Sequence, residues 1–92
     1  MMMKYMEFTF FGFSDDFIQS KKLEKVAVDS ENWLTFYQNE ETKWIEFYPF
    51  SEYHAGGIPY IINIGTNDFE DWIKRHKDFV TQIRVLIETK VQ

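Results

Sequence analysis

The chain has no cysteine, and only four glycines and two prolines, among its 92 residues. Without thiols, neither a disulfide framework nor a thiolate zinc site can form. No apolar run approaches the roughly 18 residues that a membrane-spanning helix needs. The opening "MMMKYMEFTFFGF" also lacks the pattern of a secretory signal peptide. We therefore expect a soluble cytoplasmic protein with no membrane association, folded as a single domain over residues 1–92.

Basic residues are in short supply, and the net charge is −5. The imbalance lies in residues 1–65, which carry ten acidic and five basic side chains, whereas residues 66–92 carry five of each. Direct nucleic-acid binding needs clustered lysine and arginine to replace phosphate counterions. We expect no direct nucleic-acid contact, and the charge favours a basic protein partner.

Aromatic residues are abundant, at 20% of the chain, and much of the chain alternates between apolar and polar positions. This pattern predicts strands over residues 4–13, 23–28 and 59–65. Two further aromatic runs, 33–38 and 43–50, are joined by the polar link "NEET", which predicts a β-hairpin. One face of that hairpin is purely apolar and should meet the core; it consists of Leu34, Phe36, Ile45 and Phe47.

Helical spacing of apolar residues begins at Phe69 and continues for about 22 residues, or roughly 33 Å. Asn67 followed by Glu70 is a capping-box pattern at its start. Ser14 can also cap one or two helical turns over residues 15–21, with a plain loop as the alternative. We predict an α+β fold, with a single antiparallel sheet of about four to five strands and one long C-terminal helix packed across one face. The other face would then have no helix over it.

The second face of the hairpin mixes large aromatic side chains with acids, which together suit recognition of a basic protein surface. A dimer interface, or a second small core under the N-terminal residues, would explain the same mixture. On the first interpretation, the residues predicted to bind a partner are Trp33, Tyr37, Glu40, Glu41, Trp44, Glu46, Tyr48, Glu52, Tyr53 and His54.

The segment "HAGGIP" raises the question of catalysis. His54 could act as a base, and Gly56 and Gly57 could present backbone N–H groups to an anion. The simpler interpretation is a turn, since glycine allows positive φ and Pro59 fixes the start of a strand. The chain has no G-x-S-x-G, phosphate-loop or metal-binding motif, so no catalytic, cofactor-binding or metal-ligating residue is predicted.

His76, the other histidine, falls on the apolar stripe of the predicted helix. It could serve as a buried base or a pH switch. The alternative, which we favour, is a histidine at the edge of the core that is hydrogen-bonded to a backbone carbonyl.

Two segments carry a resemblance to a known class of proteins: "EYHAGGIPYIINIG" and the C-terminal "NDFEDWIKRHKDFVTQIRVLIE". With them, the chain resembles the small acidic immunity proteins that bacteria pair with polymorphic or contact-dependent toxins. The resemblance implies a non-catalytic inhibitor of a toxin, often a nuclease, whose acids take the place of phosphate. Two alternatives stay open: a small enzyme or ligand-binding domain that uses the loop from His54 to Gly57, and a structural homodimer.

Overall fold

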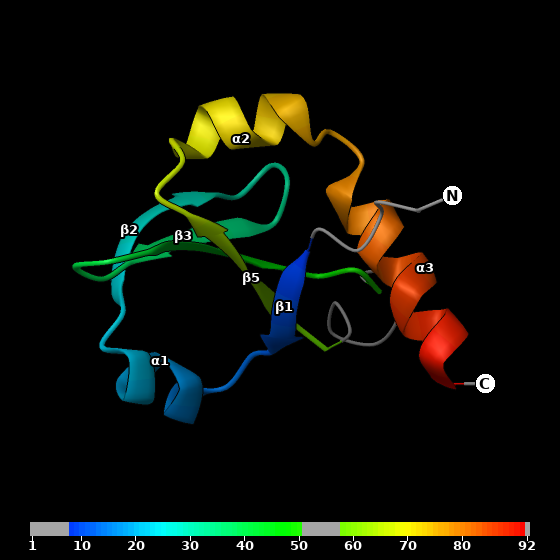
Figure 1. Cartoon of the computed structure of the whole chain (residues 1–92), viewed down its shortest axis with the longest axis horizontal. Helices are drawn as coiled ribbons and strands as arrows, with labels where there is room; N and C mark the ends of the chain where they lie inside the picture. Colours follow the sequence, from blue (N-terminus) through cyan, green and yellow to red (C-terminus); the bar gives the residue numbers. More distant parts are fainter. Residues whose placement is uncertain (1–7, 51–57, 92) are drawn as a thin grey trace, which may run out of the picture.

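The computed structural model describes residues 8–50 and 58–91, and within them the chain forms a five-stranded antiparallel sheet and three helices (Figure 1). In chain order the elements are β1 (Thr9–Gly12), α1 (Asp15–Lys21), β2 (Glu24–Asp29), β3 (Leu34–Gln38), β4 (Lys43–Phe47), β5 (Tyr60–Gly65), α2 (Phe69–Arg75) and α3 (Phe79–Val91). The strands lie in the order β1-β5-β4-β3-β2. This confirms the predicted α+β fold. Of the strand predicted at residues 4–13, positions 4–7 lie outside the described residues.

The predicted hairpin is confirmed as β3 and β4, with Thr35 opposite Glu46. Asn39 organises its turn, since the side-chain Oδ1 accepts hydrogen bonds from the backbone N–H of Glu41 at 2.8 Å and of Thr42 at 2.7 Å. Such short polar side chains favour turns by replacing a backbone acceptor. The turn fixes the register, and the register decides which side chains share a face.

The apolar face of the hairpin belongs to the main core, which lies between the sheet and the pair α2 and α3. Because Leu34, Ile45 and Phe47 are buried there and Phe36 packs against them, the predicted core face is confirmed. The buried residues of this core are Leu34, Ile45, Phe47, Ile62, Ile64, Trp72, Phe79 and Ile83.

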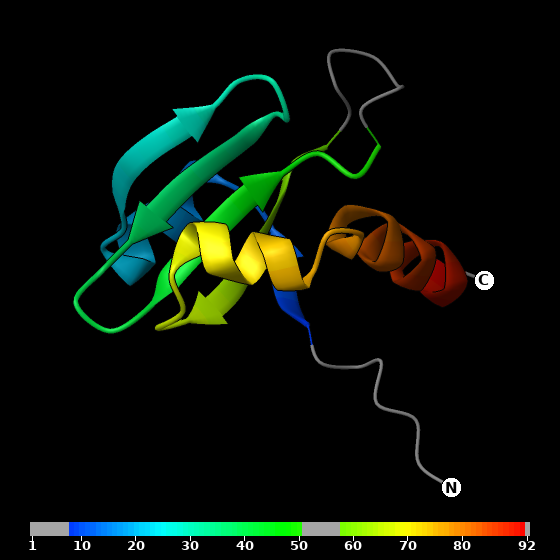
Figure 2. The ribbon, with the colours of Figure 1, turned by 90° about the horizontal axis from the view of Figure 1, so that it is seen from above.

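The C-terminal helical segment is split by a turn at residues 76–78, which differs from the single long helix that the apolar spacing predicts. In a continuous helix, residues seven positions apart lie about 10.5 Å apart along the axis. The turn instead brings the rings of Trp72 and Phe79 to a centroid distance of 5.1 Å, with both side chains buried. Packing against the sheet therefore outweighs the local helical preference. Figure 2 shows the non-helical link that joins α2 and α3.

The start of α2 also differs by one residue from the predicted cap. Asp68 is the N-cap, and its side chain accepts a hydrogen bond from the backbone N–H of Asp71 at 3.1 Å. Asn67 donates to the carbonyl oxygen of Ile64 at 2.7 Å and accepts from Arg75 at 2.9 Å. Asn67 thus ties the helix to the end of β5.

The far face of the sheet is covered, so the expectation that it lies open is wrong. Ser14 caps α1 by accepting a hydrogen bond from the backbone N–H of Phe17 at 3.2 Å. This helix lies on the side of the sheet opposite to α2 (Figure 1), and the Phe17 ring meets the Trp44 ring edge-on at 5.2 Å. A second core forms here, from Leu23, Tyr37, Trp44 and Ile61 with Phe13, Phe17 and Ile18 packed against them.

Candidate functional site

The residues predicted from the sequence to form one binding surface lie in different environments in the structure. Three of them are buried, so the solvent exposure predicted for them is wrong: Tyr37 is 6% exposed, Trp44 is 3% exposed and Glu46 is 7% exposed. The second core under α1 is the physical reason, since the rings that looked surplus to the main core pack against the N-terminal helix. Three more predicted residues, Glu52, Tyr53 and His54, lie outside the described residues, as does the loop from His54 to Gly57.

Glu40 and Glu41 are exposed at the tip of the β3–β4 hairpin. They line a polar hollow together with Lys21 and Lys22, so neighbouring bases offset their charge. Strand β3 separates this tip from Trp33 by about 17 Å, at roughly 3.4 Å per residue. The tip and Trp33 are therefore two separate places on the molecule.

Glu46 is a buried carboxylate held by two tyrosine hydroxyl groups. Tyr37 Oη donates to Glu46 Oε1 and Tyr48 Oη donates to Glu46 Oε2, each at 3.3 Å. Burial and then the neighbouring Glu46 charge raise the pKa of Tyr37 to about 12, and the same causes raise the pKa of Tyr48. Both phenols therefore stay protonated and act as donors at neutral pH. Within residues 8–50 and 58–91, no lysine or arginine forms an ion pair with Glu46.

Among the predicted aromatic binding residues that the structure describes, Trp33 is the most accessible, at 50% exposure. Its backbone is left-handed, with φ of 58°, a conformation that costs a bulky residue about 1–3 kcal/mol. The β2–β3 turn imposes this conformation, since Asn32 Nδ2 donates to Asp29 Oδ2 at 3.0 Å and the Asn32 N–H donates to the Asp29 carbonyl at 3.3 Å. The indole ring stands edge-on to Tyr48 at 5.5 Å.

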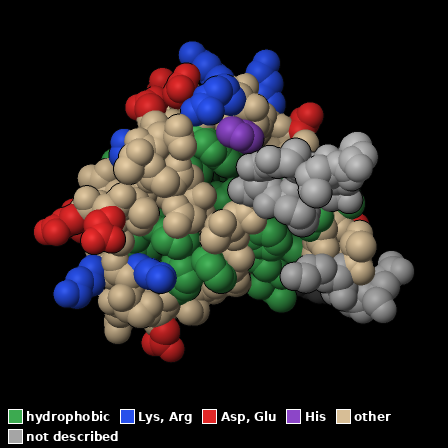
Figure 3. Space-filling view, in the orientation of Figure 1, with side chains coloured by type: hydrophobic (Ala, Val, Ile, Leu, Met, Phe, Trp, Pro, Cys, Tyr) green, Lys and Arg blue, Asp and Glu red, His purple; other side chains and the backbone are tan. Residues whose placement is uncertain are grey.

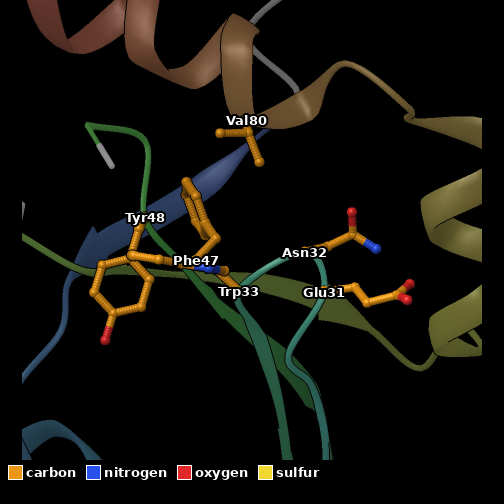
Figure 4. Close-up of a pocket in the computed structure, with 6 residues that line it drawn as sticks. All are labelled: Glu31, Asn32, Trp33, Phe47, Tyr48 and Val80. Carbon is orange, nitrogen blue, oxygen red and sulfur yellow. The ribbon is translucent and has the colours of Figure 1, made fainter. Parts of the chain in front are cut away.

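A groove of about 410 Å³ opens beside Trp33, between the β2–β3 turn and the first turn of α3 (Figure 4). We call it the Trp33 groove; its lining residues are Glu31, Asn32, Trp33, Phe47, Tyr48 and Val80. Figure 4 shows Val80 on the far side of Phe47 from the turn, with Glu31 and Asn32 at the side away from Tyr48. The groove thus pairs an aromatic wall with one acidic side chain, Glu31.

A second groove of about 530 Å³ runs between the end of β2 and helix α2. We call it the β2–α2 groove; it is lined by Val28, Asp29, Ser30, Glu31, Phe36, Glu70, Ile73 and Lys74. Glu31 lines both grooves, so they adjoin. The three acids Asp29, Glu31 and Glu70 outnumber the one base, Lys74. The combined surface is apolar at its floor and negatively charged at its rim.

Among the described residues, the exposed large apolar side chains other than Trp33 and Val28 line neither groove. On the face shown in Figure 3, apolar side chains reach the surface near the centre and charged ones lie towards the periphery. The large apolar residues that are exposed are Phe11, Val26, Val28, Trp33, Ile58 and Val85. Single exposed apolar residues are normal for a globular protein, so the pairing of Trp33 with an acid-rimmed groove is the distinguishing feature.

His76 lies at the C-cap of α2, where its Nδ1 is 2.9 Å from the carbonyl oxygen of Trp72 and its ring stacks on the Trp72 ring at 4.2 Å. This confirms the interpretation of His76 as a histidine at the edge of the core, bonded to a backbone carbonyl. Its position is explained by packing at the break between α2 and α3.

Sequence reasoning missed Glu31, Ile73, Glu70 and Val80 as members of the site. Two of the elements that carry them, α2 and α3, follow β5 in the chain, and no local pattern relates them to the β2–β3 turn. The one available signal was the turn itself, "DSENW", which places two acids within the four residues before an aromatic residue.

The described part of the chain contains no group of three histidine, cysteine, aspartate or glutamate side chains that could hold a metal ion. Among the helices described, none has the length and apolar character needed to cross a bilayer. Comparison with known proteins finds no family model, no curated protein and no solved structure that matches this chain.

Proposed function

We propose that this protein is a non-catalytic binding protein that acts in the cytoplasm by inhibiting a basic protein partner. The single observation that supports this function is the exposed Trp33 beside two adjoining grooves whose lining includes the acids Asp29, Glu31 and Glu70. The resemblance to acidic immunity proteins makes a bacterial toxin, such as a nuclease, the favoured partner. On this proposal the rim acids occupy the place that phosphate takes in the nuclease.

Trp33 is suited to anchor a protein contact. Tryptophan buries about 150–250 Å² when it is enclosed, so a half-exposed side chain still has about 100 Å² to remove from water. At about 25 cal/mol per Å², this is worth roughly 2.5 kcal/mol of binding free energy. Aromatic residues in such positions dominate many protein interfaces. Because the turn and Tyr48 hold the indole ring in place, little further rotamer entropy is lost on binding.

The acids of the two grooves select the charge of the partner. Asp29, Glu31 and Glu70 surround the apolar floor, and the whole chain carries a net charge of −5. Such a field speeds the encounter with a basic surface and disfavours acidic competitors. The association rate should therefore fall steeply as the ionic strength rises.

The test is to express the chain together with the protein encoded immediately upstream of it, purify the complex, and measure association at low and high salt. A basic partner whose activity is lost in the complex is the expected result. Trp33→Ala should weaken the complex, whereas Val85→Ala, which alters an exposed apolar residue on α3, should not. A complex that survives both Trp33→Ala and Glu31→Lys unchanged would show that this surface is not used.

A further inference from the structure

Strand β2 ends the sheet and has one free edge. It pairs with β3 along one side, and no other strand among residues 8–50 and 58–91 pairs with the opposite side (Figure 2). Val26 is 47% exposed and Val28 is 58% exposed on this strand. Unpaired N–H and C=O groups on an exposed edge are a template for another strand. The free edge is therefore a second feature, distinct from Trp33, that can engage a protein chain.

The edge borders the β2–α2 groove. Val28 and Asp29 of β2 line the groove on one side, while Ile73 and Lys74 of α2 line it on the other. A groove between an edge strand and a helix is the arrangement in which several domains accept an extended peptide as an additional strand. The backbone of the incoming chain pairs with the edge, and its alternate side chains enter the groove.

A β-bulge limits where such pairing can occur. The regular register between β2 and β3 is interrupted between Lys25 and Ala27 and continues from Ala27 to Asp29. Bulges and charged residues on an edge discourage unspecific pairing, and Glu24 and Lys25 lie before this one. The uninterrupted part of the edge is the part that lines the groove, so a docked strand would be short and fixed in position.

We propose that a short extended segment of the partner adds to β2 as a sixth strand at Ala27–Asp29, with apolar side chains at alternate positions and arginine or lysine between them. This inference rests on the proposed function and names the segment that the surface accepts. The bases occupy the alternate positions that face α2, where their stems cover Phe36 and Ile73 and their charged ends reach the rim acids. The apolar side chains between them lie beside Val28 on the opposite face of the sheet.

The acidic charge around the free edge of β2 indicates which kind of chain docks there. A second copy of the chain would bring another net charge of −5 to a groove that is already acidic, whereas a basic segment neutralises Asp29, Glu31 and Glu70. Like charges across an interface are unfavourable, and opposite charges set both partner choice and register. The basic segment is therefore the occupant that fits both the edge and the groove.

Hydrogen exchange of the backbone amides tests the proposal, with an acetylated and amidated nonapeptide of alternating arginine and valine as the probe. At a peptide concentration ten times Kd, exchange of the outward-facing amides within Ala27–Asp29 should slow about tenfold, because protection follows one plus the ratio of ligand to Kd. Two control peptides have the same length as the probe. One is N-methylated at alternate residues and cannot pair, and the other has glutamate in place of arginine.

The double variant Glu31→Lys/Glu70→Lys should weaken binding of the arginine peptide by about two- to fivefold per charge. Protection of Ala27–Asp29 that is lost with the N-methylated peptide supports strand addition. Binding without that protection overturns strand addition and leaves the proposed function intact, since capture of the partner through Trp33 tests that separately. Absence of any peptide binding also overturns it, as does protection that appears in the chain alone together with a dimer in light scattering.

Discussion

The rings of Trp33 and Tyr48 meet edge to face, at an interplanar angle of 89° and a centroid distance of 5.5 Å. Tyr48 is at the same time bonded through its hydroxyl group to the buried Glu46 carboxylate. The accessible Trp33 is therefore supported by contacts that pass through Tyr48 and Glu46 to the second core under α1. Substitutions at these residues can therefore change the affinity for the partner, the stability of the fold, or both.

Replacing Trp33 by asparagine should lower the affinity for the partner and leave the stability of the fold nearly unchanged. Asparagine tolerates the left-handed conformation, so relief of strain offsets the lost ring contact and the free energy of unfolding should change by less than about 1 kcal/mol. Affinity for the partner should fall by roughly 2.5 kcal/mol, or about seventyfold in Kd. Urea unfolding and calorimetric titration measure the two effects. Val85→Asn serves as the control at an equally exposed position.

Removal of the Glu46 carboxylate should destabilise the fold. Glu46→Ala leaves the hydroxyl groups of the buried Tyr37 and the partly buried Tyr48 without their acceptor, and a buried donor without a partner costs about 1–3 kcal/mol. We expect a total loss of about 2–4 kcal/mol in urea unfolding. Glu46→Gln keeps an acceptor oxygen and should lose less, while Glu24→Ala, on the exposed edge strand, should change stability by less than about 0.5 kcal/mol. Equal midpoints for the two alanine variants would contradict a buried role for Glu46.

The raised pKa of Tyr37 predicts a loss of stability in alkali. Its folded pKa is about 12, against 10.0 for an unperturbed tyrosine. Between these values the unfolded state has already released the proton that the native state still holds, so stability falls as pH rises through this window. Two pKa units correspond to about 2.7 kcal/mol at most. In Tyr37→Phe, unfolding between about pH 10 and pH 12 should depend less steeply on pH than in the wild type. Parallel curves for the two proteins would rule out this linkage.

A substitution at Phe17 tests whether α1 shields the far face of the sheet from water. Its ring packs edge-on against Trp44, so Phe17→Ala should cost about 2–4 kcal/mol and open a path for water to the indole. The tryptophan fluorescence should shift to longer wavelength. Phe11→Ala removes the same ring from the edge of this cluster, where it is already 45% exposed, and it should cost less. If the two variants behave alike, α1 does not seal this core.

A substitution at Phe79 tests whether packing of its ring maintains the break between α2 and α3. Because the turn at residues 76–78 buries this ring against Trp72 and Phe47, Phe79→Ala should cost about 3–5 kcal/mol. Val85→Ala on the same helix should change stability by less than about 0.5 kcal/mol. Nuclear Overhauser contacts between the Trp72 and Phe79 rings check the geometry directly, and their absence would indicate an unbroken helix.

Much of the sheet was predictable because it depends on local alternation. The hairpin β3–β4 and its core face follow from residues that are close in sequence, and Leu34, Ile45 and Phe47 lie where the period of two places them. The break at His76 was not predictable, since it depends on the fit of Trp72 and Phe79 to the sheet. The apolar spacing alone continues through it.

The candidate site was predicted only in part, and the reason is the second core. Tyr37 and Trp44 share a face with Glu46, so a solvent-facing surface was the natural interpretation of that pattern. The partners that bury them, Phe17 and Ile18, belong to a short helix whose place on the sheet depends on long-range pairing. Trp33 and Tyr48 remain at the surface because they lie at the other end of the hairpin, beyond the reach of α1.

The pairing of β1 with β5 has a consequence for the order of events during protein synthesis. Strand β1 pairs in the sheet with Tyr60–Gly65 of β5, which are translated much later than β1. Until then β1 has no strand to pair with, and its phenylalanine side chains stay in contact with water. Contacts between such distant parts of a chain slow folding, and exposed apolar surface in the meantime invites aggregation. The nascent chain is therefore most in need of chaperone protection just before β5 is complete.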